Sequence, residues 1–337
     1  MPILSEQRGD LVSTPKKRSV TAFAPATVAN VGSAFDVLGF AIERPGDTVC
    51  ATLSDSPGVS IGTISGDHGR LPTDPLLNTA SVAVLALIDH LKTTSPNTLN
   101  NVGIKLDIAK ALPIGSGLGS SSASSVAALV AVNELLGAPF SKQQLVRFAM
   151  EGEKLASGAA HADNVAPALL GGFVLIRSND PLDIIELPVP SDITVVVATP
   201  QIELKTSDAR KILKQSVPLH TAISQWGNVA ALVAGIYRND AELIGRSIQD
   251  KIIEPQRGEL IPGYSAVKQA AAAAGALGSS ISGAGPSIFA LCRKSEHAEA
   301  IANAMSKAFQ QSAGVGSTTI ISAINPNGAI ITESIEL

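Results

Sequence analysis

The chain has few aromatic residues, few cysteines and little net charge. Phe, Trp and Tyr make up 3% of its 337 residues, so Ala, Val, Leu and Ile must fill the core that an apolar content of 45% predicts. Two cysteines far apart in the sequence, Cys50 and Cys292, indicate neither a disulfide framework nor a metal cluster. They fit a reducing compartment, and we expect a cytoplasmic protein. A net charge of −4 argues against a nucleic-acid partner.

Long hydrophobic runs are also missing. No stretch approaches the roughly 20 apolar residues that a membrane-spanning helix needs, so we expect no membrane partner. The first residues lack the hydrophobic core of a secretion signal, and Glu6 and Asp10 count against a transit peptide. We interpret residues 1–19 as a flexible N-terminal arm.

Helix-like and strand-like patterns alternate along the rest of the chain, which predicts an α+β fold. The region 19–42 has strand-like ends around a loop of turn-forming residues. The Pro-rich, acidic stretch 181–192 is the expected domain boundary, between an N-terminal domain 20–190 and a C-terminal domain 191–337. We expect helices at 77–92, 120–136 (closed by Gly137), 142–157 (capped by Ser141), 207–215, 222–237, 240–250, 264–275 and 295–311. We expect strands at 47–54, 102–109, 172–177 and 193–199 and within 280–292 and 317–333.

The stretch from Leu112 to Ser125 carries the clearest functional signal. Three glycines, Gly115, Gly117 and Gly119, follow a predicted strand, and serines open the next helix. Unpaired N–H groups at a helix start and a glycine backbone that can curl around an anion together predict a phosphate cradle. The loop is not a Walker A motif, because Ser120 rather than Lys follows Gly119, and its glycine spacing is not that of a dinucleotide fingerprint. A tight turn with a serine-rich helix cap is the structural alternative, and the two interpretations are compatible.

Three separated blocks, at 24–41, 112–124 and 280–291, resemble the GHMP small-molecule kinases, and the resemblance spans residues 20 to about 335. Two more blocks, at 161–173 and 254–264, together with 205–213, resemble the branch of this family whose substrate is homoserine rather than mevalonate or galactose. The resemblance implies a mixed sheet and helix N-terminal domain with a glycine-rich phosphate loop and a ferredoxin-like α+β C-terminal domain. It also implies a phosphotransferase with an alcohol acceptor, which uses ATP to phosphorylate the side-chain hydroxyl of L-homoserine in threonine biosynthesis, and a homodimer.

Site residues for ATP follow from the same resemblance. It makes Glu153 and Ser121 the ligands of Mg²⁺, although Glu151 and Ser120 lie close enough in the sequence to take those roles. Asn78 could instead be a structural helix-start residue. The resemblance implies that ATP contacts Asn78, Pro113, Ile114, Gly115, Ser116, Gly117, Leu118, Gly119, Ser120, Ser121, Ser122, Ala123, Gly283 and Gly285.

The resemblance also implies the acceptor site. A carboxylate such as Asp36 suits the substrate ammonium, and guanidinium forks suit its carboxylate. We therefore expect Asp36 at one end of the substrate and two arginines at the other. The catalytic residues implied are Asn164, near the hydroxyl, and Asp163, as a candidate base whose role stays open. The substrate-binding residues implied are Asn30, Asp36, His161, Asn164, Thr206, Arg210 and Arg257.

Each of these residues also has a structural interpretation. Asn30 and Asp36 favour turns, a lone arginine is usually a solvated surface charge, and His161 could simply build its loop. Two alternative functions stay open at this point. One is a GHMP kinase for another small alcohol, and the other is a non-catalytic homologue that binds a nucleotide.

Overall fold

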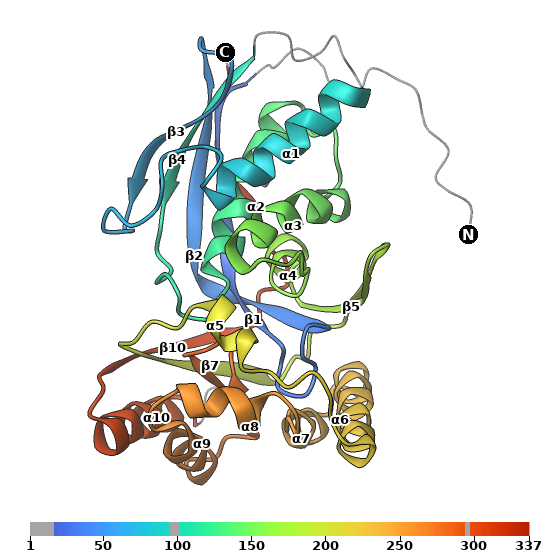
Figure 1. Cartoon of the computed structure of the whole chain (residues 1–337), viewed down its shortest axis with the longest axis vertical. Coiled ribbons are helices and arrows are strands. Elements are labelled where there is room, and N and C mark those ends of the chain that lie inside the picture. Colours follow the sequence, from blue (N-terminus) through green and yellow to red (C-terminus); the bar gives the residue numbers. More distant parts are fainter. Residues whose placement is uncertain (1–16, 95–101, 294–296, 337) are drawn as a thin grey trace.

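Two β-sheets and the helices that cover them form the protein, as the computed structural model in Figure 1 shows. The structure describes residues 17–94, 102–293 and 297–336. The larger sheet has seven strands in the order β11-β1-β2-β4-β3, with β5 paired to β2 and β6 paired to β5. Its strands are β1 (Lys17–Ala29), β2 (Leu38–Ser54), β3 (Gly58–Ser65), β4 (Gly103–Ala109), β5 (Phe173–Asn179), β6 (Leu182–Leu187) and β11 (Ile330–Glu336).

The smaller sheet has four strands in the order β10-β7-β9-β8. They are β7 (Ile193–Pro200), β8 (Gly278–Ile281), β9 (Ile288–Arg293) and β10 (Ser317–Ala323). Numbered along the chain, this order is 4-1-3-2, with helices between the first and second strands and between the third and fourth. That is the ferredoxin-like arrangement that was expected for the second half of the chain.

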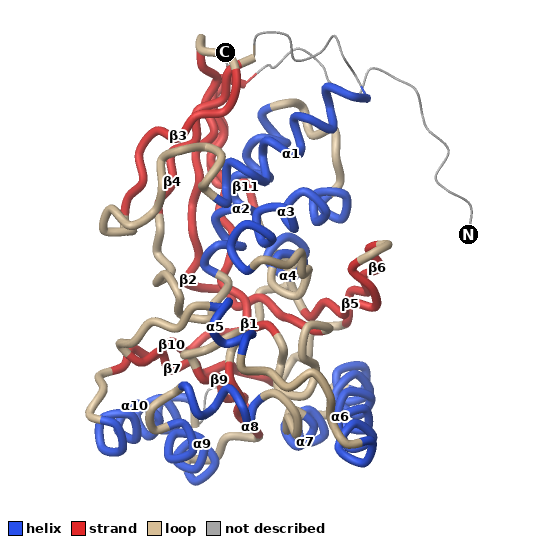
Figure 2. The backbone as a smooth tube through the Cα atoms, in the orientation of Figure 1, coloured by secondary structure: helices blue, strands red, loops and turns tan. Residues whose placement is uncertain are grey.

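Helices cover one face of each sheet (Figure 2). The larger sheet carries α1 (Thr79–Thr94), α2 (Ser120–Leu135), α3 (Lys142–Ser157) and α4 (Val165–Leu170). The short helix α5 (Thr206–Lys211) lies between the two sheets in Figure 1. The other helices of the second half are α6 (Leu219–Arg238), α7 (Ala241–Ser247), α8 (Glu254–Arg257), α9 (Tyr264–Ala273) and α10 (Ala298–Ala313). Among the described residues, no helix is both long enough and apolar enough to cross a membrane.

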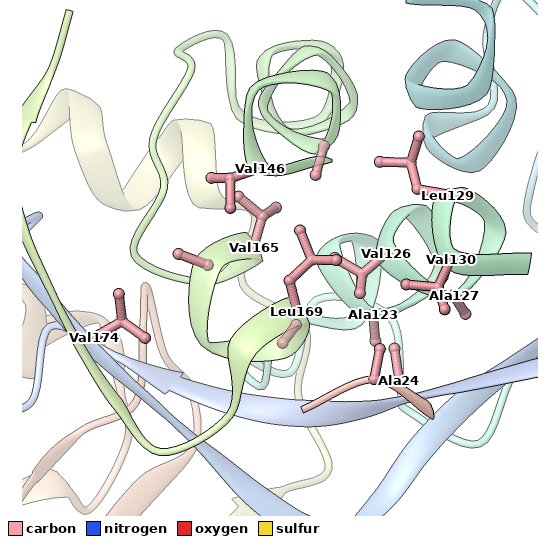
Figure 3. Packing of buried hydrophobic residues seen from close by; sticks show 14 of the residues in the cluster. Ala24, Ala123, Val126, Ala127, Leu129, Val130, Val146, Val165, Leu169 and Val174 are labelled. Atoms are coloured by element: carbon pink, nitrogen blue, oxygen red, sulfur yellow. The ribbon is translucent and has the colours of Figure 1, made fainter. Parts of the chain in front are cut away.

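Helix α2 is buried on nearly all sides, and its small residues allow that burial. Ala123, Ala127, Ala128 and Ala131 are fully buried and let the helix approach the larger sheet closely. Figure 3 shows Ala123 of α2 beside Ala24 of β1 in this core. The close approach holds the start of α2, where the glycine loop ends, rigidly against the sheet.

The predicted boundaries of two central helices are confirmed. Helix α3 begins after a capping box in which the Ser141 side chain accepts from the Gln144 N–H and the Gln144 side chain accepts in return. Gly137 follows α2 in the left-handed conformation that closes a helix. The helices expected at 77–92, 222–237, 240–250 and 264–275 and the strands expected at 102–109, 172–177 and 193–199 are also present, with shifts of a few residues at their ends. Residues 295 and 296 of the expected helix 295–311 lie outside the described residues.

Several other predictions need correction. The stretch 181–192 is not only a linker, because residues 182–187 form β6 in a hairpin with β5. The expected helix 207–215 ends early, since α5 ends at Lys211 and the Lys214 N–H turns to Gln256. The strand expected at 47–54 is the second part of the longer β2, and the sequence analysis missed β3, α4 and α8.

The expected tail at 317–333 forms two strands that join different sheets. Strand β10 pairs with β7, whereas β11 pairs with β1 of the larger sheet. The last strand therefore does not follow the predicted division at residue 190. For the rest of the chain that division stays a prediction.

One hydrophobic core continues from the larger sheet into the smaller one. The ring of Phe40 on β2 lies 4.8 Å from the ring of Phe173 on β5 and 6.0 Å from that of Phe289 on β9, measured between centroids. All three side chains are fully buried. This aromatic cluster couples the two halves of the protein mechanically.

We therefore expect Phe289→Ala to lower the free energy of unfolding by about 3–5 kcal/mol, because it leaves a cavity where the sheets meet. Urea denaturation followed by circular dichroism measures the change. Ile335→Ala, at an exposed position on β11, is the control and should change stability by no more than about 0.5 kcal/mol. A loss below about 1 kcal/mol for Phe289→Ala would contradict the coupling.

Candidate active site

The glycine-rich loop connects β4 to α2 and needs its glycines for two reasons. Gly115, Gly117 and Gly119 have φ angles of +70°, +81° and +64°, in the region where side chains are strained. A Cβ on Gly117 would lie 2.4 Å from the carbonyl oxygen of Ser282, and one on Gly119 would lie 2.1 Å from Thr27 Oγ1. The loop is therefore pressed against its neighbours and can approach a ligand with bare backbone.

A second glycine loop, residues 282–287 between β8 and β9, packs against the first. Ser282 Oγ donates to the Gly117 carbonyl at 2.8 Å, and the Ser287 N–H donates to the Ser116 carbonyl at 3.1 Å. The Gly283 N–H donates to the Ala29 carbonyl at 3.1 Å. Two loops from different sheets thus form one hydrogen-bonded unit.

A cavity of about 330 Å³ opens beside this unit. Of the residues expected to bind ATP, it is lined by Asn78, Ile114, Gly115, Ser116, Gly117, Gly119, Ser120, Ser121, Ser122 and Gly283. Leu118 and Ala123 are instead buried in the core behind the loop, Pro113 is exposed, and Gly285 packs against Ile261. Contact of these four residues with ATP stays a prediction, without support from the lining of this cavity.

Asn78 is a structural residue at the start of a helix, which was the alternative to its predicted contact with ATP. Its side-chain oxygen accepts from the Ala80 N–H at 3.0 Å, and its amide donates to the Pro72 carbonyl at 2.9 Å. Asn78 therefore ties the turn before α1 while also lining the cavity.

A buried ion pair under the loop was missed by the sequence analysis. Lys110 is among the residues that line the cavity, and its buried ammonium donates to a carboxylate oxygen of Asp47, to the Ser120 carbonyl at 2.7 Å and to Ser124 Oγ at 2.8 Å. The other oxygen of Asp47 accepts the N–H groups of Ala111 and Leu112. Burial lowers the pKa of Lys110, and the Asp47 carboxylate opposes that effect. The network ties the first turn of α2 to the strands below it.

A carboxylate from α3 reaches the start of α2. Ser122 Oγ donates to Glu153 Oε2 at 3.0 Å, and Ser121, Ser122 and Glu153 all line the cavity. Burial raises the pKa of Glu153 to about 7. Among the serines at the start of α2, Ser122 thus donates to the Glu153 carboxylate, and the role of Ser121 as the partner of Glu153 stays a prediction. Glu151 is exposed.

A smaller cavity of about 30 Å³ adjoins the first. It brings together residues that are far apart in the sequence, and five of its lining residues also line the larger cavity: Glu153, Asn164, Thr206, Gly283 and Ala284. Every residue expected to hold the acceptor lines it, namely Asn30, Asp36, His161, Asn164, Thr206, Arg210 and Arg257, as does Asp163.

The expected separation of Asp36 from both arginines is wrong for Arg210. The Arg210 guanidinium donates to both carboxylate oxygens of Asp36, at 2.9 and 3.0 Å. Opposite charges in a partly buried pocket stabilise each other strongly, so these two side chains pair directly. His161 Nδ1 lies 3.7 Å from Asp36 Oδ2, and burial lowers the pKa of His161.

Arg257 is held by backbone carbonyls instead. It donates to the carbonyls of Ala209 and Gly283, at 3.2 and 3.0 Å, and is only 2% exposed. Burial, followed by repulsion from Arg210, lowers its pKa to about 10, so it is still a cation at neutral pH. The pocket therefore contains a fixed positive group suited to a substrate carboxylate.

The two candidate catalytic residues occupy different environments. Asn164 Oδ1 accepts from Thr27 Oγ1 at 2.7 Å, which orients its side chain between the two cavities. Thr27 was not predicted from the sequence. Asp163 is buried, and desolvation, with repulsion from Asp36 and Glu153, raises its pKa to about 8.

Comparison with known proteins places the chain in a family. Residues 78–172 match the N-terminal domain of the GHMP kinases, and residues 232–311 match their C-terminal domain. A homoserine kinase of Chlorobaculum tepidum is 51% identical over 320 residues, which cover 93% of this chain and 98% of that protein. The chain belongs to the homoserine kinase family of GHMP kinases. A homoserine kinase of Xylella fastidiosa is 40% identical over 326 residues, which cover 97% of this chain and 98% of that protein.

Solved structures agree with this assignment. The crystal structure of homoserine kinase from Cytophaga hutchinsonii has 50% sequence identity and a TM-score of 0.87, over 98% of this chain and all of that one. Mevalonate kinase from L. major shares the fold, with a TM-score of 0.69 at 18% identity, over 91% of this chain and 98% of that one. The predicted family and two-domain α+β fold are confirmed.

The raised pKa of Asp163 predicts a pH effect on stability. The folded protein binds this proton more tightly than the unfolded chain, in which the pKa is near 3.8. The stability that Asp163 contributes is therefore fully present below pH 4 and is lost as the pH rises through about 8. Asparagine does not titrate. We therefore expect the free energy of unfolding of Asp163→Asn, relative to that of the wild type, to be higher at pH 9 than at pH 5.

Urea unfolding at the two pH values measures this gain. Glu151→Gln is the control, because Glu151 is exposed. If the difference in stability between the wild type and Asp163→Asn were the same at both pH values, the pKa of Asp163 would not be raised in the folded protein.

Proposed function

We propose that this protein uses ATP to phosphorylate the side-chain hydroxyl of L-homoserine, forming O-phospho-L-homoserine for threonine biosynthesis. The observation that carries the proposal is the pair of adjoining cavities. The larger is lined by a glycine loop and a helix start, and the smaller by Arg257 and the Asp36–Arg210 pair. A nucleotide polyphosphate suits the lining of the first cavity, and the charged groups around the second suit the ammonium and carboxylate of a small amino acid.

The larger cavity is suited to an anion in three ways. The N–H groups at the start of α2 point out of the helix, the glycines leave the backbone accessible, and Lys110 is one of the lining residues, with its ammonium paired to Asp47. These features support a triphosphate in this position, with its transferred end toward the smaller cavity.

We propose Mg²⁺ as the metal of the reaction. Glu153 fits this role, because a buried carboxylate with a pKa near 7 gains from a cation that replaces its proton. Glu153 would hold the ion with a hydroxyl of Ser121 or Ser122, and the bound ion would neutralise charge on the phosphates.

The smaller cavity supports an acceptor with both an ammonium and a carboxylate group. Arg257 would bind the carboxylate, and Asp36 would share its negative charge between Arg210 and the ammonium. Mevalonate lacks the ammonium, and a sugar lacks the carboxylate. Homoserine therefore fits this set of charges better than either.

We propose direct attack of the hydroxyl on the γ-phosphorus. The new bond forms between the homoserine oxygen and phosphorus, the bond from phosphorus to the ADP oxygen breaks, and the hydroxyl proton leaves late to a phosphate oxygen or to water. Phosphoryl transfer has a loose transition state that depends on positioning more than on a strong base. Asp163, with a pKa of about 8, is mostly protonated at neutral pH and is poorly suited to be that base.

An assay of ADP release with ATP and L-homoserine, with L-threonine and L-serine as controls, tests the function. Preferred turnover of homoserine would support it. Turnover of a different small alcohol would favour the first alternative, and ATP binding without turnover of any amino alcohol would favour the non-catalytic one. A cytoplasmic homodimer also remains a proposal, which light scattering and cell fractionation test.

Arg257→Ala should raise the KM for homoserine about 10- to 100-fold and leave the KM for ATP almost unchanged, because a charge-assisted hydrogen bond to the acceptor carboxylate is lost. Steady-state kinetics with each substrate varied in turn measures both constants. Arg293→Ala, at an exposed arginine on β9, is the control. Equal increases in both KM values would contradict this role for Arg257.

Asp163→Asn should keep a kcat within about tenfold of the wild type, since no base is required in direct attack. Rapid-quench measurement of the chemical step gives the rate. A collapse of kcat at an unchanged KM for homoserine, in a variant that still folds, would mean that Asp163 accepts the proton.

A further inference from the structure

The loop that joins β1 to β2 is held in an unfavourable backbone conformation. Asn30, Val31 and Asp36 are not glycines, yet they have φ angles of +72°, +41° and +61°. A β-branched residue such as Val31 is especially strained in this region. Strain of this kind persists only where the surroundings hold the backbone in place, and it is common at functional sites.

Contacts from the second half of the chain hold this loop. Asn30 Nδ2 donates to the Gly283 carbonyl at 2.7 Å, and Ser33 Oγ donates to the Ser247 carbonyl at 2.9 Å. Gln225 Nε2 donates to the Ser33 carbonyl at 2.7 Å. The tip of the loop, with Phe35 and Asp36, is thereby fixed next to the smaller cavity.

The ring of Phe35 lies against both arginines of the acceptor site. The guanidinium carbon of Arg257 is 4.9 Å from the ring centroid, and that of Arg210 is 5.4 Å from it. Both distances are within the range of cation–π attraction. Arg210 and Arg257 line the smaller cavity, whereas Phe35 is not among its lining residues, so the ring contacts the acceptor site through these two side chains.

The two guanidinium groups need this support to different degrees. Arg210 is also held by two hydrogen bonds to Asp36. Arg257 has backbone carbonyls as its hydrogen-bond partners and is repelled by Arg210. The negative face of an aromatic ring offsets that repulsion without donating or accepting a hydrogen bond, so the ring uses none of the N–H groups that could bind an anion.

We propose that Phe35 is a positioning residue that makes the acceptor site specific for a carboxylate, by holding the guanidinium groups of Arg210 and Arg257 on its ring. The inference rests on the proposed function, because the acceptor carboxylate is taken to be that of homoserine. Phe35 acts through the arginines and does not touch the reacting atoms.

Kinetics of Phe35→Leu and Phe35→Tyr test the proposal. Leucine keeps the apolar bulk but lacks a π face, so the KM for homoserine should rise roughly tenfold while the KM for ATP stays within about twofold. Tyrosine keeps the ring and should restore a KM for homoserine within about threefold of the wild type. Equal values for the two variants would overturn the proposal.

A second acceptor that lacks a carboxylate shows whether Phe35 acts on binding of that group. 3-Aminopropan-1-ol has the hydroxyl and ammonium of homoserine but no carboxylate, so Phe35→Leu should reduce its kcat/KM far less than that of homoserine. An equal loss for both acceptors would mean that the ring only maintains the fold, and would overturn the proposal.

Phe148→Leu is the matched control. The guanidinium of Arg147 lies 4.6 Å from the Phe148 ring centroid, so this change also removes a ring from an arginine, on α3 and outside both cavities. It should leave the KM for homoserine unchanged, and a rise equal to that of Phe35→Leu would overturn the proposal.

Crystal structures of the two Phe35 variants separate this inference from the proposed function. We expect displaced guanidinium groups of Arg210 and Arg257 in Phe35→Leu and retained positions in Phe35→Tyr, whatever the acceptor is. Unmoved guanidinium groups in Phe35→Leu would overturn the positioning role even if the enzyme phosphorylates homoserine. Failure of the wild type to use homoserine, with the guanidinium groups displaced in Phe35→Leu, would instead overturn the proposed function.

Discussion

Contact between the two glycine loops is the constraint on which the site depends. Gly117 has no side chain, so the Ser282 carbonyl can approach to a distance that any Cβ would prevent, and Ser282 Oγ binds the Gly117 carbonyl at 2.8 Å. Because one loop precedes α2 and the other joins β8 to β9, this contact places residues of both sheets around the same two cavities. A small displacement of either sheet would open the site, which the shared aromatic core resists.

Several ionisable side chains are buried in the site, and the cost of burying their charge is met in different ways. Asp47 compensates Lys110 under the glycine-rich loop, and Asp36 compensates Arg210 in the smaller cavity. Glu153 and Asp163 are not paired in this way, and their pKa values rise to about 7 and about 8. The buried surroundings of these groups have a low dielectric constant, which strengthens the electrostatic interactions between the site and a ligand. With a pKa of about 8, Asp163 is mostly protonated at neutral pH, which fits the proposed direct attack, with positioning as the contribution of the protein, better than proton transfer to Asp163.

Local patterns predicted local features well. The serine cap of α3, the glycine that closes α2 and the glycine-rich loop before α2 depend on residues adjacent in the sequence, so they could be recognised there. Contacts between distant residues were not accessible in this way. Asp36 and Arg210 are 174 positions apart, and no pattern indicates that they bind each other rather than opposite ends of a substrate. The same holds for Lys110 with Asp47 and for Phe35, whose role appears only when two arginines from other elements reach its ring.

By itself, the sequence determined the family, the positions of the central helices and the residue types available to the site. These follow from periodicity and from short motifs, which act over a few residues of chain. Only the tertiary structure showed that Ser122 donates to Glu153, that Arg257 is held by backbone carbonyls, and that the last strand belongs to the larger sheet. Those outcomes depend on how two sheets and their loops pack, because hydrogen-bond geometry and desolvation vary over distances of an ångström that the order of residues does not encode.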